Sequence, residues 1–256
     1  CFLNAVIQAL AHIPGFAHRV TRHTPHRCTG RTCTGCAFGN TLNAFRVGPM
    51  EQPVDPAALR QVLASSTSPR FPPRQAGDAT EALQHILGEI HRAGNAQGQC
   101  PPECASHEWF GCLSRRFRTC DVCGHGVRVS DGDSFGIHCN ANLVLTSNSH
   151  HDRGSAKHFA DRVRAASMDG DIICEKCGNR NVPINRALVR CPPIFIITLG
   201  WLQQTALVPP GAHLLRYLAS LIPELIDINA LFETSYPDLP APQGRLVGLI
   251  GFLPGH

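Results

Sequence analysis

The sequence lacks any long apolar run and has few aromatic residues. No stretch of about 18 apolar residues occurs, which excludes an ordinary transmembrane helix. Phe, Trp and Tyr together make up 6% of the 256 residues, and the net charge is only +4 with histidine neutral. A nucleic-acid-binding domain usually has a clustered basic surface or stacking aromatic residues, and this composition favours neither. We therefore expect no membrane partner and no nucleic-acid partner.

A secretory leader, with its basic, apolar and small-residue segments, is also missing, so nothing indicates secretion. Cysteine, by contrast, is abundant at 13 residues, and some of these cysteines form CxxC pairs. In a reducing compartment such spacing is more typical of metal binding than of disulfides. We expect an intracellular protein, in the cytoplasm or alternatively in the nucleus.

Helical signals dominate the first 95 residues. Residues 2–12 place apolar side chains near one face and contain neither Gly nor Pro. A second helix is expected to begin at Asp55-Pro56, an N-cap followed by proline. Asp78 is expected to cap a third helix, with Glu81 three residues later as its capping-box partner.

From about residue 107 onward, short strand-like runs separated by turns replace the helical pattern. They lie at 109–120, 126–130, 141–147, 184–191, 193–201 and 245–253. A basic insertion, HHDRGSAKHFADRVRAAS, is expected to form a solvated helical surface. This segregation predicts an α+β fold with a helical lobe and a sheet lobe.

Two CxxC pairs, Cys120–Cys123 and Cys174–Cys177, are separated by 50 residues. Each pair can aim two thiolates at one point, and two pairs complete a tetrahedral Zn–S₄ site. Gly124 and Gly178 directly follow the pairs and supply the backbone freedom that such a knuckle needs. The alternatives are incidental turns or a redox dithiol. The pattern predicts one structural Zn²⁺ held at the end of a two-stranded arm.

A second group of potential metal ligands is less regular in its spacing. Its members are Cys28, Cys33, Cys36, Cys100, Cys104 and His107, with His26 as a seventh. Some of these cysteines could instead be small buried apolar residues, because unpaired cysteine is often buried. A second metal site is therefore a hypothesis with an open alternative.

Cys1 directly precedes the expected helix at 2–12. The positive end of a helix dipole lowers a thiol pKa and so favours a nucleophilic thiolate, although a cysteine at a helix start is more often structural. A cysteine hydrolase also needs a histidine as general base. With 14 histidines in the chain, spacing does not choose among them.

Several motifs, in order along the whole chain, resemble those of the ubiquitin-specific proteases, which are papain-like cysteine deubiquitinases. CFLNAVIQALAHIP is similar to their cysteine box, and RQAGDATEALQHILGEI is similar to their second motif. CDVCG and CEKCG lie where the family has its zinc ribbon, and LVGLIGFLPGH resembles the histidine box. The segments HRCTGRTCTGC and CPPECASH point to the large divergent members, whose activity is doubtful.

The resemblance implies a thumb, palm and fingers fold with a zinc ribbon in the fingers. Residues 1–256 would form a catalytic domain truncated at both ends, with a helical thumb at 1–106 and a palm and fingers at 107–256. Its partners would be ubiquitin, polyubiquitin chains and ubiquitinated proteins.

The resemblance also implies a thiol protease that hydrolyses the peptide or isopeptide bond after ubiquitin's C-terminal glycine. Cys1 would be the nucleophile and His256 the general base, which also protonates the departing amine. Asp78 and Glu81 match family positions that bind the arginine-rich tail of ubiquitin, in addition to the capping role expected above.

An alternative function is an inactive ubiquitin-binding scaffold of the same fold. The presence of both Cys1 and His256 favours the enzyme, whereas the short apolar loop GFLPGH in the histidine box favours the scaffold. The cysteine deubiquitinase is the function that we expect.

Overall fold

The computed structural model describes most of the chain. The described residues are 2–22, 33–48, 54–65, 71, 78–94, 100, 104–146, 156–166, 173–180, 182, 184–201, 212–232, 234–235 and 243–248. The chain divides into two compact units, whose main parts are Cys1–Trp109 and Phe110–Val247. Among the residues that the structure describes, none of the helices combines the length and the apolar character that a membrane span requires.

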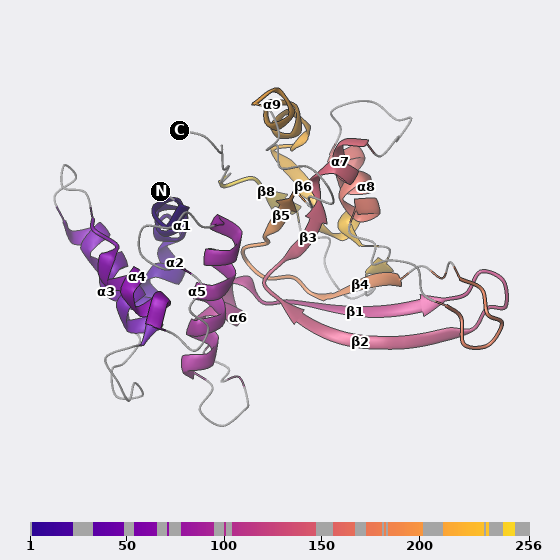
Figure 1. Ribbon diagram of the computed structural model, residues 1–256, viewed down its shortest axis with the longest axis horizontal. Coiled ribbons are helices and arrows are strands. Elements are labelled where there is room, and N and C mark those ends of the chain that lie inside the picture. The colour runs from indigo at the N-terminus through magenta and orange to yellow at the C-terminus, as the bar shows by residue number, and fades with distance from the viewer. Residues whose placement is uncertain are drawn as a thin grey trace. The chain divides into compact units, whose positions relative to one another are not determined.

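The first unit is helical (Figure 1). Its helices are α1 (Phe2–Ala11), α2 (Pro14–Thr21), α3 (Thr34–Val47), α4 (Ala57–Ser65), α5 (Ala79–Gly94) and α6 (Ala105–Phe110). Helix α5 packs against both α1 and α3, and α3 also packs against α2 and α4. The helices expected near 2–12, after Asp55 and after Asp78 are all confirmed.

Helix α5 shows why this sequence forms a helix here. Asp78 Oδ1 accepts a hydrogen bond from the Glu81 N–H at 2.9 Å, which satisfies a backbone donor that the helix itself leaves unpaired. The apolar side chains recur at helical spacing, so they share one face. The fully buried members are Ala82, Ile86 and Leu87.

Helix α6 is fixed to the rest of the helical unit by polar and aromatic contacts. The buried Ser106 hydroxyl donates to the Leu87 carbonyl of α5 at 2.8 Å. On the other side, Arg19 of α2 pairs with Glu108 at 3.2 Å. The Trp109 ring lies so close to Gly15 of α2 that a Cβ there would come within 2.2 Å of it. Glycine at position 15 is therefore what lets Trp109 approach α2.

The second unit is built on a four-stranded sheet with the order β2-β1-β4-β7. The strands are β1 (Cys112–Thr119), β2 (Gly126–Ser134), β4 (Ile184–Arg190) and β7 (Thr234–Ser235). Strand β1 pairs antiparallel with both β2 and β4, and β4 pairs parallel with β7. Figure 1 shows β1 and β2 as a long two-stranded arm.

Two smaller sheets and several helices complete this unit. The parallel pair is β3 (Ile137–Asn140) with β5 (Ile197–Gly200), and the antiparallel pair is β6 (Leu225–Asp227) with β8 (Gln243–Arg245). The helices are α7 (Ala141–Thr146), α8 (Ala156–Ala166), α9 (Ala212–Leu221) and a 3₁₀ turn, η2 (Ile228–Leu231). Side chains from β3, α7, α8, α9 and η2 share one apolar core.

The strand expected at 141–147 is wrong where the structure describes it, because residues 141–146 form helix α7. Asn140, the last residue of β3, accepts a hydrogen bond from the Asn142 N–H at 3.0 Å and so caps the new helix. Ala141 and Val144 are both fully buried and lie three residues apart, so they share a helical face. The capping asparagine and packing against α8 outweigh the strand propensity of the apolar run.

The expectation of a solvated basic surface at 150–167 is also wrong where the structure describes this segment. Helix α8 buries Phe159, Ala160 and Val163 in the core of the second unit. Arg162 is only 7% exposed, and its guanidinium donates to the carbonyls of Val144 and Leu145 at 2.7 and 3.1 Å. A cation is favourable there because the carbonyl groups at the C-terminal end of a helix carry partial negative charge.

Other expected strands have different limits, and of the strand expected at 193–201 only Ile197–Gly200 forms β5. Trp109 and Phe110 belong to α6, and β1 begins only at Cys112. The expected strand at 245–253 ends at Arg245, because its partner β6 starts at Leu225, opposite Arg245. Residues 246–248 are not in a strand, and 249–253 lie outside the described residues.

Gly136 gives a test of the second unit. Its φ is +117°, and a Cβ would lie 2.2 Å from the Ile196 carbonyl oxygen. Gly136→Ala should therefore lower the free energy of unfolding by about 2 kcal/mol or more, measured by chemical denaturation.

The matched control is Gly132→Ala in β2, where a Cβ would meet no heavy atom within 4 Å. We expect this control to stay within about 0.5 kcal/mol of the parent. Equal unfolding midpoints for the two variants would contradict the close approach of Gly136 to Ile196.

Candidate functional site

The proposed catalytic pair, Cys1 and His256, lies outside the described residues. The neighbouring residue, Phe2, is the first residue of α1 and is only 5% exposed. Its ring lies 5.7 Å from the ring of Phe71, and the Arg60 guanidinium carbon lies 5.7 Å from its centroid. Phe71 in turn contacts His85 of α5, with ring centroids 5.7 Å apart. The first turn of α1, next to Cys1 in the chain, is thus held by aromatic and cation–π contacts.

Asp78 and Glu81 lie at the N-terminal end of α5, in the same unit. Asp78 is exposed and caps the helix, and Glu81 is half-buried in the first turn. The capping role expected for Asp78 is therefore confirmed. An exposed carboxylate remains available to a ligand, and the positive end of the helix dipole stabilises its charge.

The four ribbon cysteines come together in the second unit. Cys120 and Cys123 lie in the turn between β1 and β2, and Cys174 and Cys177 lie before β4. Their four sulfurs lie within 4.8 Å of one another, with Cys120–Cys177 at 3.5 Å and Cys123–Cys174 at 3.7 Å. A tetrahedral ion with Zn–S bonds of about 2.3 Å would separate its sulfurs by about 3.8 Å. The donor set and its dimensions therefore fit zinc.

The two knuckles have the same backbone pattern. The Gly124 N–H donates to the Cys120 carbonyl at 2.8 Å, and the Gly178 N–H donates to the Cys174 carbonyl at 2.9 Å. Both glycines have positive φ, at 64° and 74°, in the left-handed region that favours glycine. The sequence-based expectation for these two glycines is confirmed. Matched turns of this kind present four sulfurs to one point.

Backbone N–H groups favour the thiolate form at the two leading cysteines. Hydrogen bonds, the one from the Cys123 N–H first among them, lower the pKa of Cys120 from 9.0 to about 6 against the opposing effect of burial. The Cys177 N–H likewise lowers the pKa of Cys174. At Cys177 the Asn179 N–H lowers the pKa, but the nearby thiols, Cys120 first among them, oppose it and raise it to about 12. Crowded sulfurs of this kind favour a bound cation, which removes their mutual repulsion.

Cysteines in the core of the second unit have the opposite property. Burial raises the pKa of Cys112 to about 12 and that of Cys139 to about 11, and it also raises the pKa of Cys191. These side chains remain thiols at neutral pH, so they are poor nucleophiles. No disulfide joins any pair of the described cysteines.

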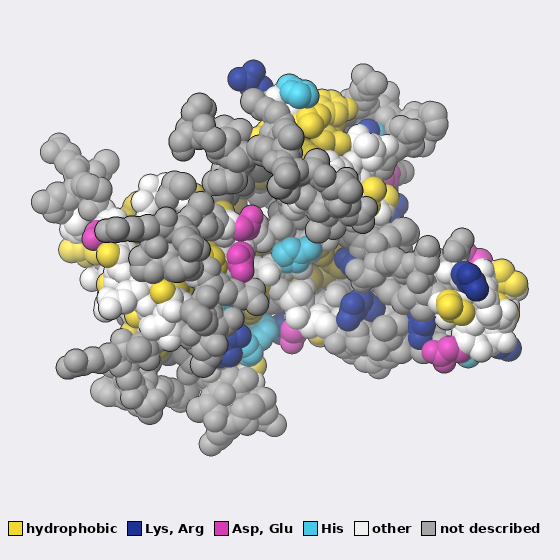
Figure 2. Space-filling model, viewed as in Figure 1, with side chains coloured by type: hydrophobic (Ala, Val, Ile, Leu, Met, Phe, Trp, Pro, Cys, Tyr) yellow, Lys and Arg dark blue, Asp and Glu magenta, His cyan; other side chains and the backbone are white. Residues whose placement is uncertain are grey.

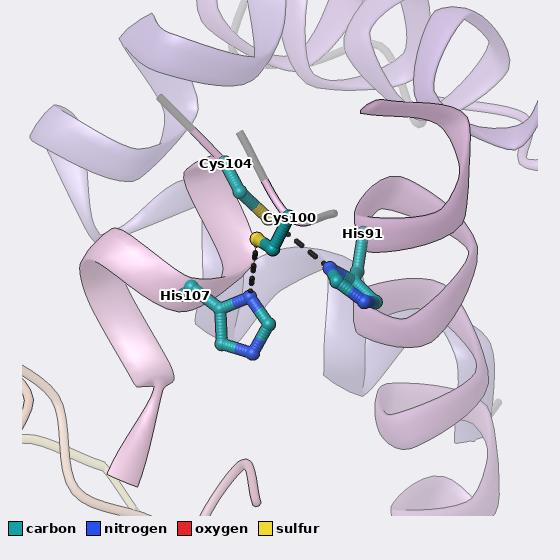
Figure 3. Close-up of side chains that lie close together, drawn as sticks. All are labelled: His91, Cys100, Cys104 and His107. Carbon is teal, nitrogen blue, oxygen red and sulfur yellow. Dashed lines mark hydrogen bonds between the residues drawn. The ribbon is translucent and has the colours of Figure 1, made fainter. Parts of the chain in front are cut away.

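The helical unit contains a second group of metal-ligating side chains. Figure 3 shows His91, from the last turn of α5, beside Cys100, Cys104 and His107. Their four ligand atoms lie within 4.8 Å of one another. The structure thus brings together three residues of the hypothesised second site and adds His91, which the sequence analysis did not include.

The other members of the hypothesised second site lie elsewhere or are not described. Cys33 caps α3, and its sulfur accepts from the Cys36 N–H at 3.4 Å. Both line a cavity of about 400 Å³ with Asp55, and neither joins a metal-ligating group among the described residues. His26 and Cys28 lie outside the described residues.

His91 escaped the sequence analysis because it follows an apolar helical stripe. A histidine in the last turn of a helix is commonly explained by the helix dipole alone. The signal that could have found it is its position nine residues before the segment CPPECASH.

The charged surface is mixed. In Figure 2 the Lys and Arg side chains on the visible face are dispersed among acidic and uncharged ones. Several arginines form ion pairs, such as Arg118 with Glu175 and Arg190 with Asp133, each at 3.3 Å.

The raised pKa values of Cys112 and Cys139 give a prediction. At pH 8 about one Cys112 in 10,000 and one Cys139 in 1,000 would be thiolate, so both should resist iodoacetamide in the folded protein. Peptide mapping by mass spectrometry checks this result, with the denatured protein as the control. Folding raises the pKa of both thiols, so the contribution of the two neutral thiols to the free energy of unfolding is fully present below about pH 9. That contribution is lost as the pH rises through 11 to 12. Equal alkylation in folded and denatured protein would contradict the burial of these thiols.

Known structures with the same fold include modules of the SAGA complex. The chain is similar to a structure of the SAGA deubiquitinating module, in which Ubp8, Sgf11, Sus1 and Sgf73 are bound to monoubiquitin, with a TM-score of 0.56 and 15% identity. This match covers 77% of this chain and 45% of the other. A second structure of the module, bound to ubiquitin aldehyde, also has a TM-score of 0.56 at 15% identity. This match covers 78% of this chain and 44% of the other. The expected fold class is confirmed.

Sequence relatives are much longer than this chain. Ubiquitin carboxyl-terminal hydrolase 54 of Mus musculus is 28% identical over 215 residues, which are 78% of this chain and 13% of the relative. Ubiquitin carboxyl-terminal hydrolase 53 of Homo sapiens is 26% identical over 248 residues, which are 90% of this chain and 23% of the relative. A family model described as ubiquitin carboxyl-terminal hydrolase matches residues 1–207. The chain therefore belongs to the ubiquitin carboxyl-terminal hydrolase family.

Proposed function

We propose that this chain forms the catalytic domain of a cysteine deubiquitinase, with Cys1 as nucleophile and His256 as general base. The observation that carries the proposal is the start of α1 at Phe2, in a chain whose family match begins at Cys1. The N-terminus of a helix lowers the pKa of an adjacent thiol. The contacts of Phe2 with Phe71 and Arg60 hold the first turn of α1 in place.

The proposed reaction has two steps. The Cys1 thiolate attacks the carbonyl carbon of ubiquitin's C-terminal glycine, the C–N bond breaks, and His256 gives its proton to the departing amine. Water then attacks the thioester carbonyl carbon while His256 takes a proton from it, the C–S bond breaks, and the ubiquitin carboxylate leaves with the Cys1 thiolate and the protonated His256 restored. The buried thiols of the second unit do not compete, because their pKa values are raised.

Substrate recognition is proposed to involve Asp78 and Glu81 at the start of α5. The solved structures of the same fold are complexes bound to monoubiquitin and to ubiquitin aldehyde, which supports ubiquitin as the ligand. Carboxylates pair well with arginine side chains through charge-assisted hydrogen bonds. Polyubiquitin chains and ubiquitinated proteins would be the larger substrates.

Zinc is proposed as a structural cofactor of the four-cysteine ribbon. Cys120, Cys123, Cys174 and Cys177 would hold the ion, fill its four positions and leave none for chemistry. We also propose an intracellular location, because reducing conditions keep such cysteines available for metal.

A covalent probe tests the catalytic proposal. Ubiquitin carrying a C-terminal electrophile should form an adduct that raises the mass of the protein by one ubiquitin. Cys1→Ala should abolish this labelling, and Cys191→Ser is the matched control that should retain it. Intact-protein mass spectrometry reads both results.

Two outcomes would overturn the proposed activity. Labelling that persists in Cys1→Ala would place the nucleophile elsewhere. Ubiquitin binding without any labelling would instead establish the inactive scaffold.

Asp78→Asn separates the two roles of Asp78. Asparagine caps a helix about as well as aspartate, so the unfolding temperature should change little. Loss of a charge-assisted pair of about 1.5–3 kcal/mol should weaken ubiquitin binding by roughly 10- to 150-fold, measured by titration calorimetry.

Asp55→Asn is the matched control for this measurement. Asp55 caps α4 in the same way, accepting from the Ala57 N–H at 2.9 Å, and is not proposed to bind ubiquitin. If Asp78→Asn binds ubiquitin as tightly as Asp55→Asn does, Asp78 is only a helix cap.

A further inference from the structure

We propose that His91, Cys100, Cys104 and His107 form a second structural zinc site, separate from the ribbon and contained in the helical unit. Two thiols and two imidazoles are a complete tetrahedral donor set for zinc. The proposal does not depend on catalytic activity.

The distances between the ligand atoms support this assignment. Cys100 Sγ lies 2.8 Å from His107 Nδ1, and Cys104 Sγ lies 3.6 Å from His91 Nδ1. Zinc bonds of about 2.3 Å to sulfur and about 2.0–2.1 Å to nitrogen would put such pairs about 3.5 Å apart. The two observed distances lie on either side of that value, and all four ligand atoms fit within 4.8 Å.

The orientation of the two imidazoles is consistent with a shared ion. The His91 and His107 rings meet edge to face, with centroids 4.5 Å apart and planes at 85°. Each ring turns its Nδ1 toward a sulfur (Figure 3). Nδ1 of both rings would therefore be the ligating atom.

The elements that carry the ligands are fixed independently of any metal. His91 is in the last turn of α5, Cys104 directly precedes α6, and His107 is within α6. Ser106 lies between Cys104 and His107 in the sequence, and its hydroxyl donates to the Leu87 carbonyl, one turn before His91. The Glu108 N–H donates to the Cys104 carbonyl at 2.8 Å, which sets Cys104 and His107 on the first turn of α6. A site with ligands held in this way is preorganised.

The donor chemistry selects among metals. Soft thiolates together with imidazoles favour Zn²⁺ over Mg²⁺ or Ca²⁺, which prefer oxygen ligands. Two thiolates also neutralise the charge of the ion, which matters because Cys104 is only 5% exposed. The ion would link His91 at the end of α5 to Cys100 and to the two ligands at the start of α6.

Zinc content tests the site in the whole purified protein. The double variant Cys100→Ser, His107→Gln should hold about one zinc ion fewer per chain than the parent, measured by inductively coupled plasma mass spectrometry. The matched control, Cys191→Ser with His18→Ala, changes one cysteine and one histidine outside both groups and should lose none. Undiminished zinc in the Cys100, His107 variant would overturn the proposal.

X-ray absorption at the zinc edge gives a second test that needs no variant. Six thiolates and two imidazoles shared by two ions predict an average of about three sulfurs and one nitrogen per zinc. A protein with zinc only in the ribbon would show four sulfurs and no nitrogen, which would refute the site. A Cys100–Cys104 disulfide, found as a loss of two hydrogens from the intact mass, would refute it as well.

Discussion

Burial of one face of α5 is the constraint on which the helical unit depends. Ile86 and Leu87 are fully buried, and each contributes about 1.5–3 kcal/mol through removal of its side chain from water. Burial of this face fixes the rotation of α5 about its own axis. It therefore also fixes the directions in which side chains at both ends of the helix project. Asp78 at the start caps the helix and faces solvent, and His91 at the end faces the two cysteines and His107. One packed face thus positions a proposed substrate contact and a proposed metal ligand.

The parts of the structure that could be predicted from sequence are those with local causes. The N-cap at Asp78, the proline start after Asp55 and the two glycines after the CxxC pairs all depend on residues within a few positions of each other. The ribbon was predictable for the same reason, because each knuckle is complete within five residues. The cysteine box and the other motifs gave the family, which the matches along residues 1–207 show.

The parts that could not be predicted depend on tertiary contacts. Residues 141–146 form a helix because α8 packs against α7 in addition to the local cap at Asn140, and the packing against α8 cannot be read from the local sequence. Arg162 looks like a surface cation in the sequence, but the carbonyls at the end of α7 make its burial favourable. His91 belongs to a metal-ligating group only because α6 packs beside α5. The roles of Cys1 and His256 rest on the family motif.

The 50-residue separation of the two knuckles has a consequence for folding kinetics. The first knuckle lies in the β1–β2 turn and can form early. The second knuckle follows β2, β3, α7 and α8 in the sequence, so it can meet the first only after this intervening chain has folded back. Closing a loop of this length costs on the order of 3 kcal/mol in chain entropy. The β1–β4 pairing spans the same long loop and has high contact order, so we expect the sheet unit to fold more slowly than the helical unit. A metal ion bound first by Cys120 and Cys123 would then be the ligand that Cys174 and Cys177 bind when the intervening chain folds back.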